Sequence, residues 1–323
     1  MRLHQIPTRR SFLRQTGAAA IASALVGLPI ATGKKRIALD VAKVEYQLYR
    51  NATARLHYAG MTFLLDPMLS AKGELPSFAG IAPNPTVELP APVHDIVADI
   101  DAVIVSHLHE DHFDDAAAKI LSKDIPLITP RNRAPISPRD PAKTVSHSQR
   151  LKDYGFTDVR EIDDEDSNST TFRGVTLTQT WALHGEGKVG ELMGGVNGIV
   201  LSAPGMPTIY WAGDTILDVV EMDHILSLYK PDIVIAHTGG PVVEALSPEI
   251  LLMDAAQGAE LVEMVSRYNK NAFVIAVHME ALDHCFSSRK DFMAAVAKVD
   301  SDIQRRVFAP ADGDVINFDW PPA

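Results

Sequence analysis

Apolar residues along this chain gather mostly in short runs of strand length, with longer amphipathic segments between them. Alternating or continuous apolar patterns predict strands over 44–49, 54–58, 62–65, 102–105, 126–129, 159–162, 170–172, 175–180, 198–202, 208–211, 233–236, 273–277 and 315–318. Helical periodicity covers 114–122, 147–154, 219–229, 254–266 and 289–299. Because strands and helices interleave in two similar halves, we expect an α/β fold, an αββα sandwich of two mixed β-sheets flanked by helices.

Two long segments lack any periodic pattern. Residues 67–92 are rich in Pro, Gly and Ala, and residues 185–197 contain several glycines. Long irregular connections in a compact domain are often functional, so we expect the first to cover part of the domain and the second to be a flexible loop near a pocket mouth. No linker pattern divides the chain between 34 and 323, so we expect one domain there.

The first 33 residues have the pattern of an export signal. Arg9 and Arg10 precede an apolar run over 18–31, which at 14 residues is shorter than the roughly 20 that a membrane-spanning helix needs. The adjacent arginines followed by Phe-Leu resemble a twin-arginine signal peptide. This resemblance implies that residues 1–33 are a signal peptide, that 34–323 form the mature domain, and that the twin-arginine machinery delivers it to a bacterial periplasm.

Composition limits the classes of partner. The 323 residues carry a formal charge of −11, and loss of four arginines with residues 1–33 would change it to −15. Such an acidic chain disfavours nucleic acid, so we expect a small-molecule substrate. Cys285 stands alone, which excludes a disulfide within the chain and a metal cluster built on cysteine.

One short motif concentrates groups that bind metal. His107, His109, Asp111 and His112 directly follow the apolar run 102–105. Three imidazoles and a carboxylate in such a short span would be poorly solvated and mutually repulsive without a cation. Nitrogen and oxygen ligands of this kind suit zinc, with manganese or iron as alternatives.

Further candidate side chains follow later predicted strands. His184, Asp214 and His278 each stand just after one, so together they supply ligands for a second metal. His237 ends another strand and His284 lies six residues beyond His278. Either of these two could contact substrate or protonate a leaving group, and a structural part is the alternative for both.

The order of these residues resembles the metallo-β-lactamase superfamily. The resemblance implies one metal on His107, His109 and His184. It implies a second metal on Asp111, His112 and His278, with Asp214 bridging the two and Asp66 supporting the metal loops. Within the superfamily, the chain is most similar to the branch of the ascorbate-phosphate lactonase and the N-acyl-phosphatidylethanolamine phospholipase D.

This resemblance implies a hydrolase that uses two divalent metal ions, most simply zinc. A hydroxide held between the cations would attack a carbonyl carbon, and Asp111 would both ligate and orient that nucleophile. We expect a lactone or another carboxylic ester as substrate. A phosphodiesterase on the same site is the alternative, and a non-catalytic metal-binding or sensing module is an alternative of another class.

Overall fold

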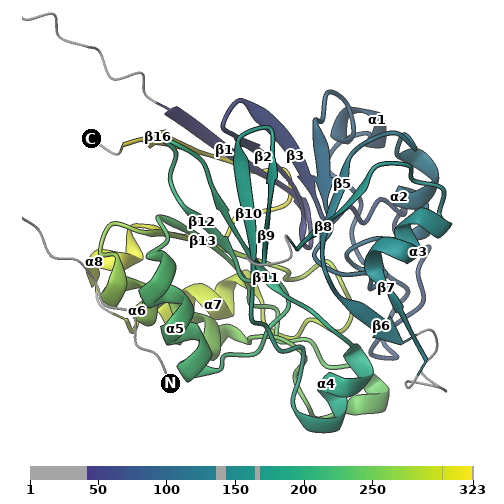
Figure 1. Ribbon diagram of the computed structural model, residues 1–323. Helices are drawn as coiled ribbons and strands as arrows, with labels where there is room; N and C mark the ends of the chain where they lie inside the picture. The colour runs from purple at the N-terminus through teal and green to yellow at the C-terminus, as the bar shows by residue number, and fades with distance from the viewer. Residues whose placement is uncertain (1–41, 136–142, 164–167, 300, 322–323) are drawn as a thin grey trace, which may run out of the picture. The chain divides into compact units, whose positions relative to one another are not determined.

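Two β-sheets organise the chain in the computed structural model, which describes residues 42–135, 143–163, 168–299 and 301–321 (Figure 1). These residues belong to one compact unit. The predicted signal peptide lies outside the described residues. The predicted fold class is confirmed, because both sheets are mixed, each contains seven strands, and helices flank them.

The first sheet holds the N-terminal strands and the last one. Its spatial order is β16-β1-β2-β3-β4-β5-β8. Strands β3, β4, β5 and β8 pair in parallel, whereas β16, β1, β2 and β3 pair antiparallel. The strands are β1 (Ala42–Arg50), β2 (Thr53–Tyr58), β3 (Met61–Leu65), β4 (Ala102–Ile104), β5 (Leu127–Pro130), β8 (Val159–Ile162) and β16 (Val315–Trp320).

The second sheet has the order β15-β14-β13-β12-β11-β10-β9. Here β12 to β15 are parallel and β9 to β12 are antiparallel. The strands are β9 (Ser169–Phe172), β10 (Val175–Thr180), β11 (Gly198–Ser202), β12 (Ile209–Trp211), β13 (Ile233–His237), β14 (Phe273–Val277) and β15 (Val307–Phe308). A separate antiparallel pair comprises β6 (Arg133–Pro135) and β7 (Thr144–Ser146).

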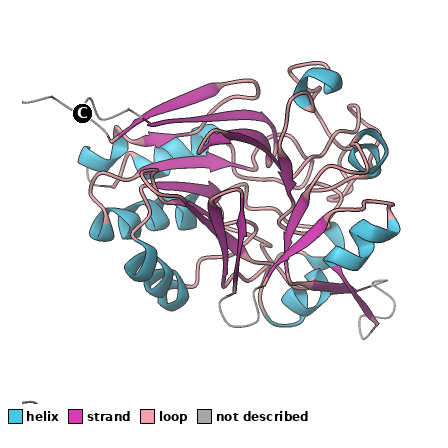
Figure 2. Ribbon diagram, turned by 45° about the horizontal axis from the view of Figure 1, so that its top comes forward, coloured by secondary structure: helices cyan, strands magenta, loops and turns pink. Residues whose placement is uncertain are grey.

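Helices cover the outer face of each sheet (Figures 1 and 2). The first sheet carries α1 (Val93–Ile96), α2 (Asp115–Ile120) and α3 (His147–Asp153). The second carries α5 (Val219–Tyr229), α6 (Ala255–Tyr268), α7 (Arg289–Val296) and α8 (Ser301–Gln304). Short helices α4 (Gly187–Met193) and η1 (Glu244–Leu246) lie in connections.

Three apolar clusters correspond to these layers. The central one joins the facing sides of the two sheets, for example Leu56 and Phe63 against Leu177 and Trp211. Each outer cluster lies between one sheet and its helices. Continuous burial of β4, β5 and β13 explains why those strands read as unbroken apolar runs rather than alternating ones.

Two sequence expectations need correction. Residues 185–197 are not wholly a loop, because α4 occupies 187–193, where glycines at both ends hide a helical turn from pattern analysis. Strands β6 and β7 were also not expected, since each is only three residues long. The irregular course expected for 67–92 is confirmed, because no helix or strand forms there.

The carboxyl ends of the parallel strands in both sheets point to the same edge of the sandwich. This edge is where loops of layered α/β folds present functional groups. Strands β3 and β4 lead into Asp66 and His107, whereas β13 and β14 lead into His237 and His278. Within the described residues, the helices are all too short or too polar to cross a bilayer.

A buried histidine at the start of α3 makes stability depend on pH. His147 begins α3, is 1% exposed, and has no hydrogen-bond partner at Nδ1. Burial, aided by repulsion from His109, lowers the pKa of His147 to about 3. Because the unfolded chain binds a proton near pH 6.5 and the folded chain does not, acid favours unfolding.

We therefore expect His147→Phe to flatten the acid limb of the stability profile. The wild type should lose about 2 kcal/mol more than the variant between pH 7.5 and pH 5. Urea unfolding of both chains across that range measures the difference. Parallel profiles would contradict the buried, neutral state of His147.

Candidate metal centre

The structure brings the seven predicted ligand side chains together at the common edge of the two sheets. Four of them come from the loop after β4, and the other three follow β10, β12 and β14. All except His109 are buried. Two groups of side chains have the spacing that a metal ion requires: His107, His109 and His184 in one, and His112, Asp214, His237 and His278 in the other.

The first group consists of three imidazoles. Nε2 of His107 lies 3.0 Å from Nδ1 of His109, and Nε2 of His184 lies 3.2 Å from that same atom. Burial lowers the pKa of His109, and it lowers the pKa of His184 to about 4. The pKa of His107 is held well below its usual value, first by burial and then by neighbouring histidines. All three rings are therefore neutral near pH 7.

Hydrogen bonds on the outer side of these rings fix where the remaining protons are. His109 donates from Nε2 to the Met193 carbonyl at 3.0 Å, and His184 donates from Nδ1 to the Leu251 carbonyl at 2.7 Å. Because carbonyl oxygens only accept, Nδ1 of His109 and Nε2 of His184 must carry lone pairs.

The tautomer of His107 follows from a similar chain of bonds. The Ser106 hydroxyl donates to Asp66 at 2.6 Å, so its oxygen can only accept from Nδ1 of His107, 3.0 Å away. Nε2 of His107 is then unprotonated as well. Three lone pairs therefore converge within hydrogen-bonding distance with no proton between them, an arrangement that a cation stabilises.

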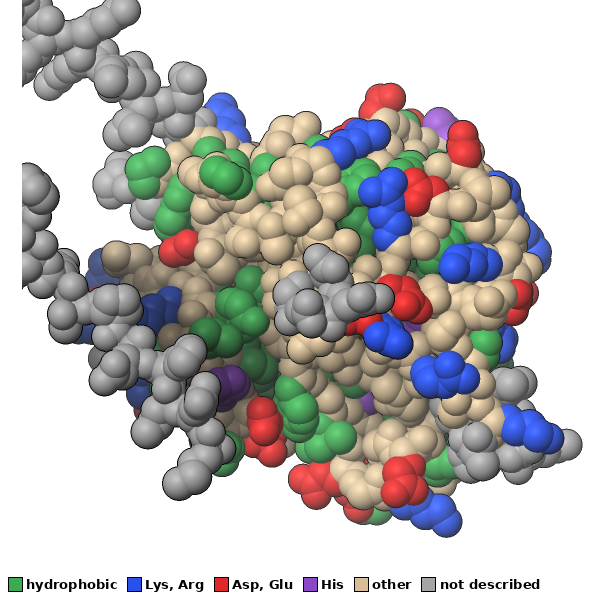
Figure 3. All heavy atoms as spheres, viewed as in Figure 1, with side chains coloured by type: hydrophobic (Ala, Val, Ile, Leu, Met, Phe, Trp, Pro, Cys, Tyr) green, Lys and Arg blue, Asp and Glu red, His purple; other side chains and the backbone are tan. Residues whose placement is uncertain are grey.

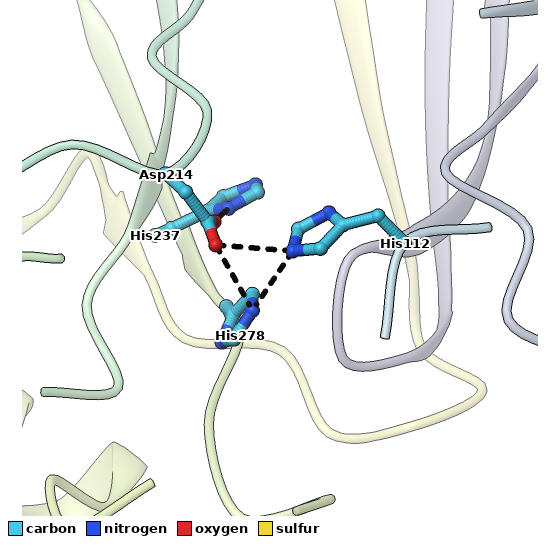
Figure 4. A group of neighbouring side chains, drawn as sticks. All are labelled: His112, Asp214, His237 and His278. Atoms are coloured by element: carbon cyan, nitrogen blue, oxygen red, sulfur yellow. Dashed lines mark hydrogen bonds and ion pairs between the residues drawn. The ribbon is translucent and has the colours of Figure 1, made fainter. Parts of the chain in front are cut away.

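The second group contains His112, Asp214 and His278 (Figure 4). Nε2 of His278 lies 3.2 Å from Nε2 of His112, and Oδ2 of Asp214 lies 3.1 Å from that same His112 atom. The Asp111 carboxylate is next to them, with Oδ2 3.2 Å from Nε2 of His278. These atoms come from both sheets, so folding alone assembles the group.

Asp214 lies between the two groups. Its Oδ2 atom is 3.8 Å from Nε2 of His107 and 3.5 Å from Nε2 of His184. The same oxygen is 3.7 Å from Nε2 of His278. One carboxylate oxygen thus faces imidazoles of both groups, which is the position required of a bridging ligand.

Charges in the second group depend on each other. Burial would lower the pKa of His112, but Asp214, Asp111 and Asp66 outweigh it and raise that pKa to about 10. Burial would likewise raise the pKa of Asp214, but His112 and His278 hold it well below its usual range. Positive charge is therefore required beside these carboxylates, and a divalent cation can supply it in place of protons.

Backbone geometry at the centre is unusual in two places. Asp66 and His278 have φ angles of +37° and +64°, in the left-handed region that costs energy for residues other than glycine. Asp66 accepts from Nδ1 of His112 at 2.7 Å, so its strained position orients that ring. A Cβ atom on Gly239 would lie 1.9 Å from the His278 carbonyl oxygen, so only glycine allows this approach.

His237 differs from the other histidines of the two groups because its partners are an indole N–H and the Oδ1 atom of Asp214, and not the nitrogens of another histidine. Nδ1 lies 2.6 Å from Oδ1 of Asp214, and the indole N–H of Trp211 donates to Nε2 at 2.9 Å. The Trp211 proton fixes Nε2 as an acceptor, so Nδ1 donates to Asp214. Both nitrogens thus have protein partners, so we expect His237 to position Asp214 rather than take the substrate contact inferred from sequence.

A cavity of about 240 Å³ opens beside the metal-binding side chains. Its wall includes His284, whose Nδ1 atom is buried without a partner. Burial lowers the pKa of His284 to about 4, so near pH 7 the neutral ring can hydrogen-bond a bound molecule but is a poor proton donor. The cavity is lined by Phe78, His109, Glu110, Asp111, His184, Met193, Asp214, Pro241, Val243, Leu251 and His284.

Sequence analysis missed several partners of the ligands. The carbonyls of Met193 and Leu251 are backbone groups, which no side-chain pattern marks. Trp211 lies just before Asp214 in the sequence, so its proximity to the motif can be seen there. Its indole hydrogen bond to His237 cannot be seen, because that bond depends on the pairing of β12 with β13. Cys285 lies 3.6 Å from Nδ1 of His278 and is the partner on the outer side of that ring.

The fold and these clusters define a class: a metal-dependent hydrolase built on two mixed sheets between helices. The chain belongs to the metallo-β-lactamase superfamily, because residues 61–279 match the family model described as a beta-lactamase superfamily domain.

Individual relatives agree with this assignment. The chain is 32% identical over 275 residues to the UPF0173 protein YddR of Bacillus subtilis, covering 83% of this chain and 98% of YddR. It is 26% identical over 214 residues to a UPF0173 metal-dependent hydrolase of Xanthobacter autotrophicus, covering 62% and 75% of the two chains. The crystal structure of isothiocyanate hydrolase from Delia radicum gut bacteria matches with a TM-score of 0.71 and 31% identity, covering 85% of this chain and 99% of that one.

Removal of the His237 imidazole tests its part in the centre. We expect His237→Phe to weaken metal binding about 10- to 100-fold, because Asp214 loses the bond that orients it. Trp211→Phe should act in the same direction with a smaller loss, since only the outer bond disappears. Competition with a chromogenic chelator measures both affinities.

The matched control is His57→Phe, which changes an exposed histidine on β2 and should leave affinity unchanged. Loss of one full metal equivalent in His237→Phe, even at saturating metal, would instead show that His237 is itself a ligand.

Proposed function

We propose that this chain is a binuclear metal-dependent hydrolase acting on a small, uncharged substrate, with a lactone or another carboxylic ester as the leading class. The observation that carries the proposal is the convergence of three unprotonated imidazole nitrogens, with the Asp214 carboxylate facing them and a second group. One cation beside each group would offset the repulsion between the facing lone pairs and the repulsion between the clustered carboxylates.

The donor set fits metal in type and in spacing. A tetrahedral zinc ion with nitrogen ligands at about 2.0–2.1 Å separates those nitrogens by roughly 3.3–3.4 Å. The imidazole nitrogens of the first group are 3.0 and 3.2 Å apart, slightly closer than that. His107, His109 and His184 would hold one ion, and Asp111, His112 and His278 the other, with Asp214 between them. Nitrogen and carboxylate donors suit zinc best and would also accept manganese or iron.

Bound metal ions would lower the pKa of a water molecule and polarise the bond that it attacks. The protein's own groups do the rest. Asp111 reaches the cavity and can accept a proton from the attacking water. His284 can donate a hydrogen bond to substrate from the cavity wall, and His237 keeps Asp214 in place. The apolar side chains around the opening limit access of bulk water.

The cavity wall supports an uncharged substrate. Phe78, Met193, Pro241, Val243 and Leu251 make it largely apolar, and its charged members are acids. The part of the chain that the structure describes contributes no Lys or Arg to this lining. A phosphodiester anion would therefore have the proposed metal ions as its only cationic partners in this lining, with no Lys or Arg to add to them, which favours a neutral carbonyl compound over the phosphodiesterase alternative.

Nucleic acid is disfavoured for a related reason. The chain has a formal charge of −11. Figure 3 shows Lys and Arg side chains scattered over one face with acids between them, rather than gathered in a stripe. A phosphate backbone binds best to a continuous basic surface. We therefore propose a small molecule as the partner.

An isothiocyanate is the second candidate substrate. The isothiocyanate hydrolase from Delia radicum gut bacteria is 31% identical to this chain. An isothiocyanate is uncharged and has an electrophilic carbon that water can attack, so it meets the same demands as an ester in an apolar cavity. Within the predicted branch, likeness to the lactonase supports the ester, whereas likeness to the phospholipase D supports the phosphodiester alternative.

One experiment distinguishes these candidate functions. We expect about two equivalents of metal per chain by elemental mass spectrometry of the purified protein. The zinc-, manganese- and iron-loaded forms are then assayed on γ-butyrolactone, 4-nitrophenyl acetate, bis(4-nitrophenyl) phosphate and benzyl isothiocyanate. Asp214→Ala should lose one metal equivalent and at least about 100-fold in rate, because the oxygen shared by both groups is gone.

The outcomes differ clearly. Hydrolysis of the lactone or ester supports the leading class, and hydrolysis of the isothiocyanate alone supports the second. Turnover confined to the phosphodiester would overturn the argument from the apolar wall. Two bound metals without turnover of any substrate would favour a metal-binding or sensing module.

We also propose export to a periplasm, supported by Arg9, Arg10 and the apolar run that follows them. Fractionation of a bacterium expressing the full chain should place the protein in the periplasm. Replacing Arg9 and Arg10 with lysine should retain it in the cytoplasm, because a twin-arginine signal depends on that pair. Arg14→Lys is the control, and export of the double variant at the normal level would refute the proposal.

A further inference from the structure

An irregular segment forms part of the cavity wall. Residues 77–84 contain no helix or strand, yet Phe78 lines the cavity. Backbone amides that are not paired in secondary structure need other acceptors. A segment without such acceptors would move, and the wall that it forms would have no fixed shape.

The acceptor is a single carboxylate about 200 positions further along the chain. Asp283 is 9% exposed and accepts from the Ser77 hydroxyl and from the Asn84 amide at 2.7 Å. In the opposite direction, its backbone N–H donates to Oδ1 of Asn84 at 2.8 Å. It also accepts from four backbone N–H groups at 3.0–3.3 Å, those of Phe78, Ala79, Ile81 and Ala82.

The carboxylate is ionised in this setting. Burial alone would raise the pKa of Asp283, but the bonds from Ser77 and Asn84 and from the backbone hold it well below its usual range. Hydrogen bonds to an ionised acceptor are about twice as strong as neutral ones. Asp283 is thus the main anchor of the segment.

This anchor reaches the cavity through two neighbours. His284 follows Asp283 directly, and its ring forms a T-shaped contact with the Phe78 ring, with centroids 5.1 Å apart and planes at 87°. The Phe78 carbonyl accepts from the Glu244 backbone at 3.1 Å, and the neighbouring Val243 also lines the cavity. The position of the Phe78 ring in the cavity wall therefore depends on the bonds of Asp283.

We propose that Asp283 is a positioning residue that sets the size selectivity of the cavity, by holding residues 77–84 and with them the Phe78 ring beside the metal-binding side chains. The proposal deepens the proposed function and rests on it for the cavity being a substrate site. Asp283 touches none of the candidate ligands, so its loss should change which molecules fit and leave metal binding intact.

Selectivity can be measured without turnover, because thiols bind zinc directly. Calorimetry on the zinc-loaded full chain would give Kd values for ethanethiol, phenylmethanethiol and 2-phenylethanethiol. The wild type should discriminate by size. The quantity compared is the factor by which the Kd values of the smallest and the largest thiol differ. Asp283→Asn should reduce this factor about tenfold, because an amide cannot accept from all six donors. Phe78→Ala should reduce it similarly through the ring itself.

A matched control uses the same chemistry at the opposite end of the strands. Asp232 precedes β13 and accepts from the Thr208 backbone and the Asn269 amide at 2.9 and 3.0 Å. Asp232→Asn should leave the thiol ratio unchanged. Hydrogen exchange of residues 77–84 should accelerate at least tenfold in Asp283→Asn and stay unchanged in Asp232→Asn, with zinc content equal in all chains.

Unchanged exchange in Asp283→Asn would overturn the anchor. An unchanged thiol ratio in both Asp283→Asn and Phe78→Ala would overturn the effect on selectivity, whatever the catalytic result. If Asp283→Asn does not fold, the Phe78→Ala ratio alone decides the selectivity. Failure of the hydrolase proposal is visible separately, because thiol binding does not require hydrolysis.

Discussion

The structure of the centre depends on lone pairs that face each other. Backbone carbonyls bind the outer N–H groups of His109 and His184, and the Ser106 hydroxyl, committed to Asp66, does the same for His107. Once those protons are fixed outside, the inner nitrogens have none to share. The fold thus creates a site whose electrostatics demand a cation, and this demand follows from hydrogen bonds rather than from residue types alone.

The two sheets contribute ligand residues to that site in different ways. The first sheet presents a contiguous motif after β4, whereas the second presents single residues after separate strands. Asp214 comes from the second sheet and approaches histidines of both groups within 3.8 Å. The position of Asp214 therefore depends on how the two sheets pack. His237 donates a hydrogen bond to Asp214, and Trp211 in turn donates one to His237.

Much of this could be predicted from the sequence, for physical reasons. Buried parallel strands read as continuous apolar runs, so their ends, and the polar residues just after them, are visible in the pattern. The helix at 187–193 was missed because glycines interrupt its pattern. The bonds of Asp283 to residues 77–84 could not be inferred, because nothing local in either segment identifies a partner some 200 positions away.

The parts that escaped prediction are also those that link the cavity to the centre. Met193 and Leu251 line the cavity, and their carbonyls accept from the outer nitrogens of His109 and His184. A shift of either wall would therefore also move a ring that faces the cluster. At Met193 and Leu251, substrate fit and ligand orientation are thus set by the same residues, whereas the Phe78 part of the wall is held by Asp283, which touches none of the candidate ligands.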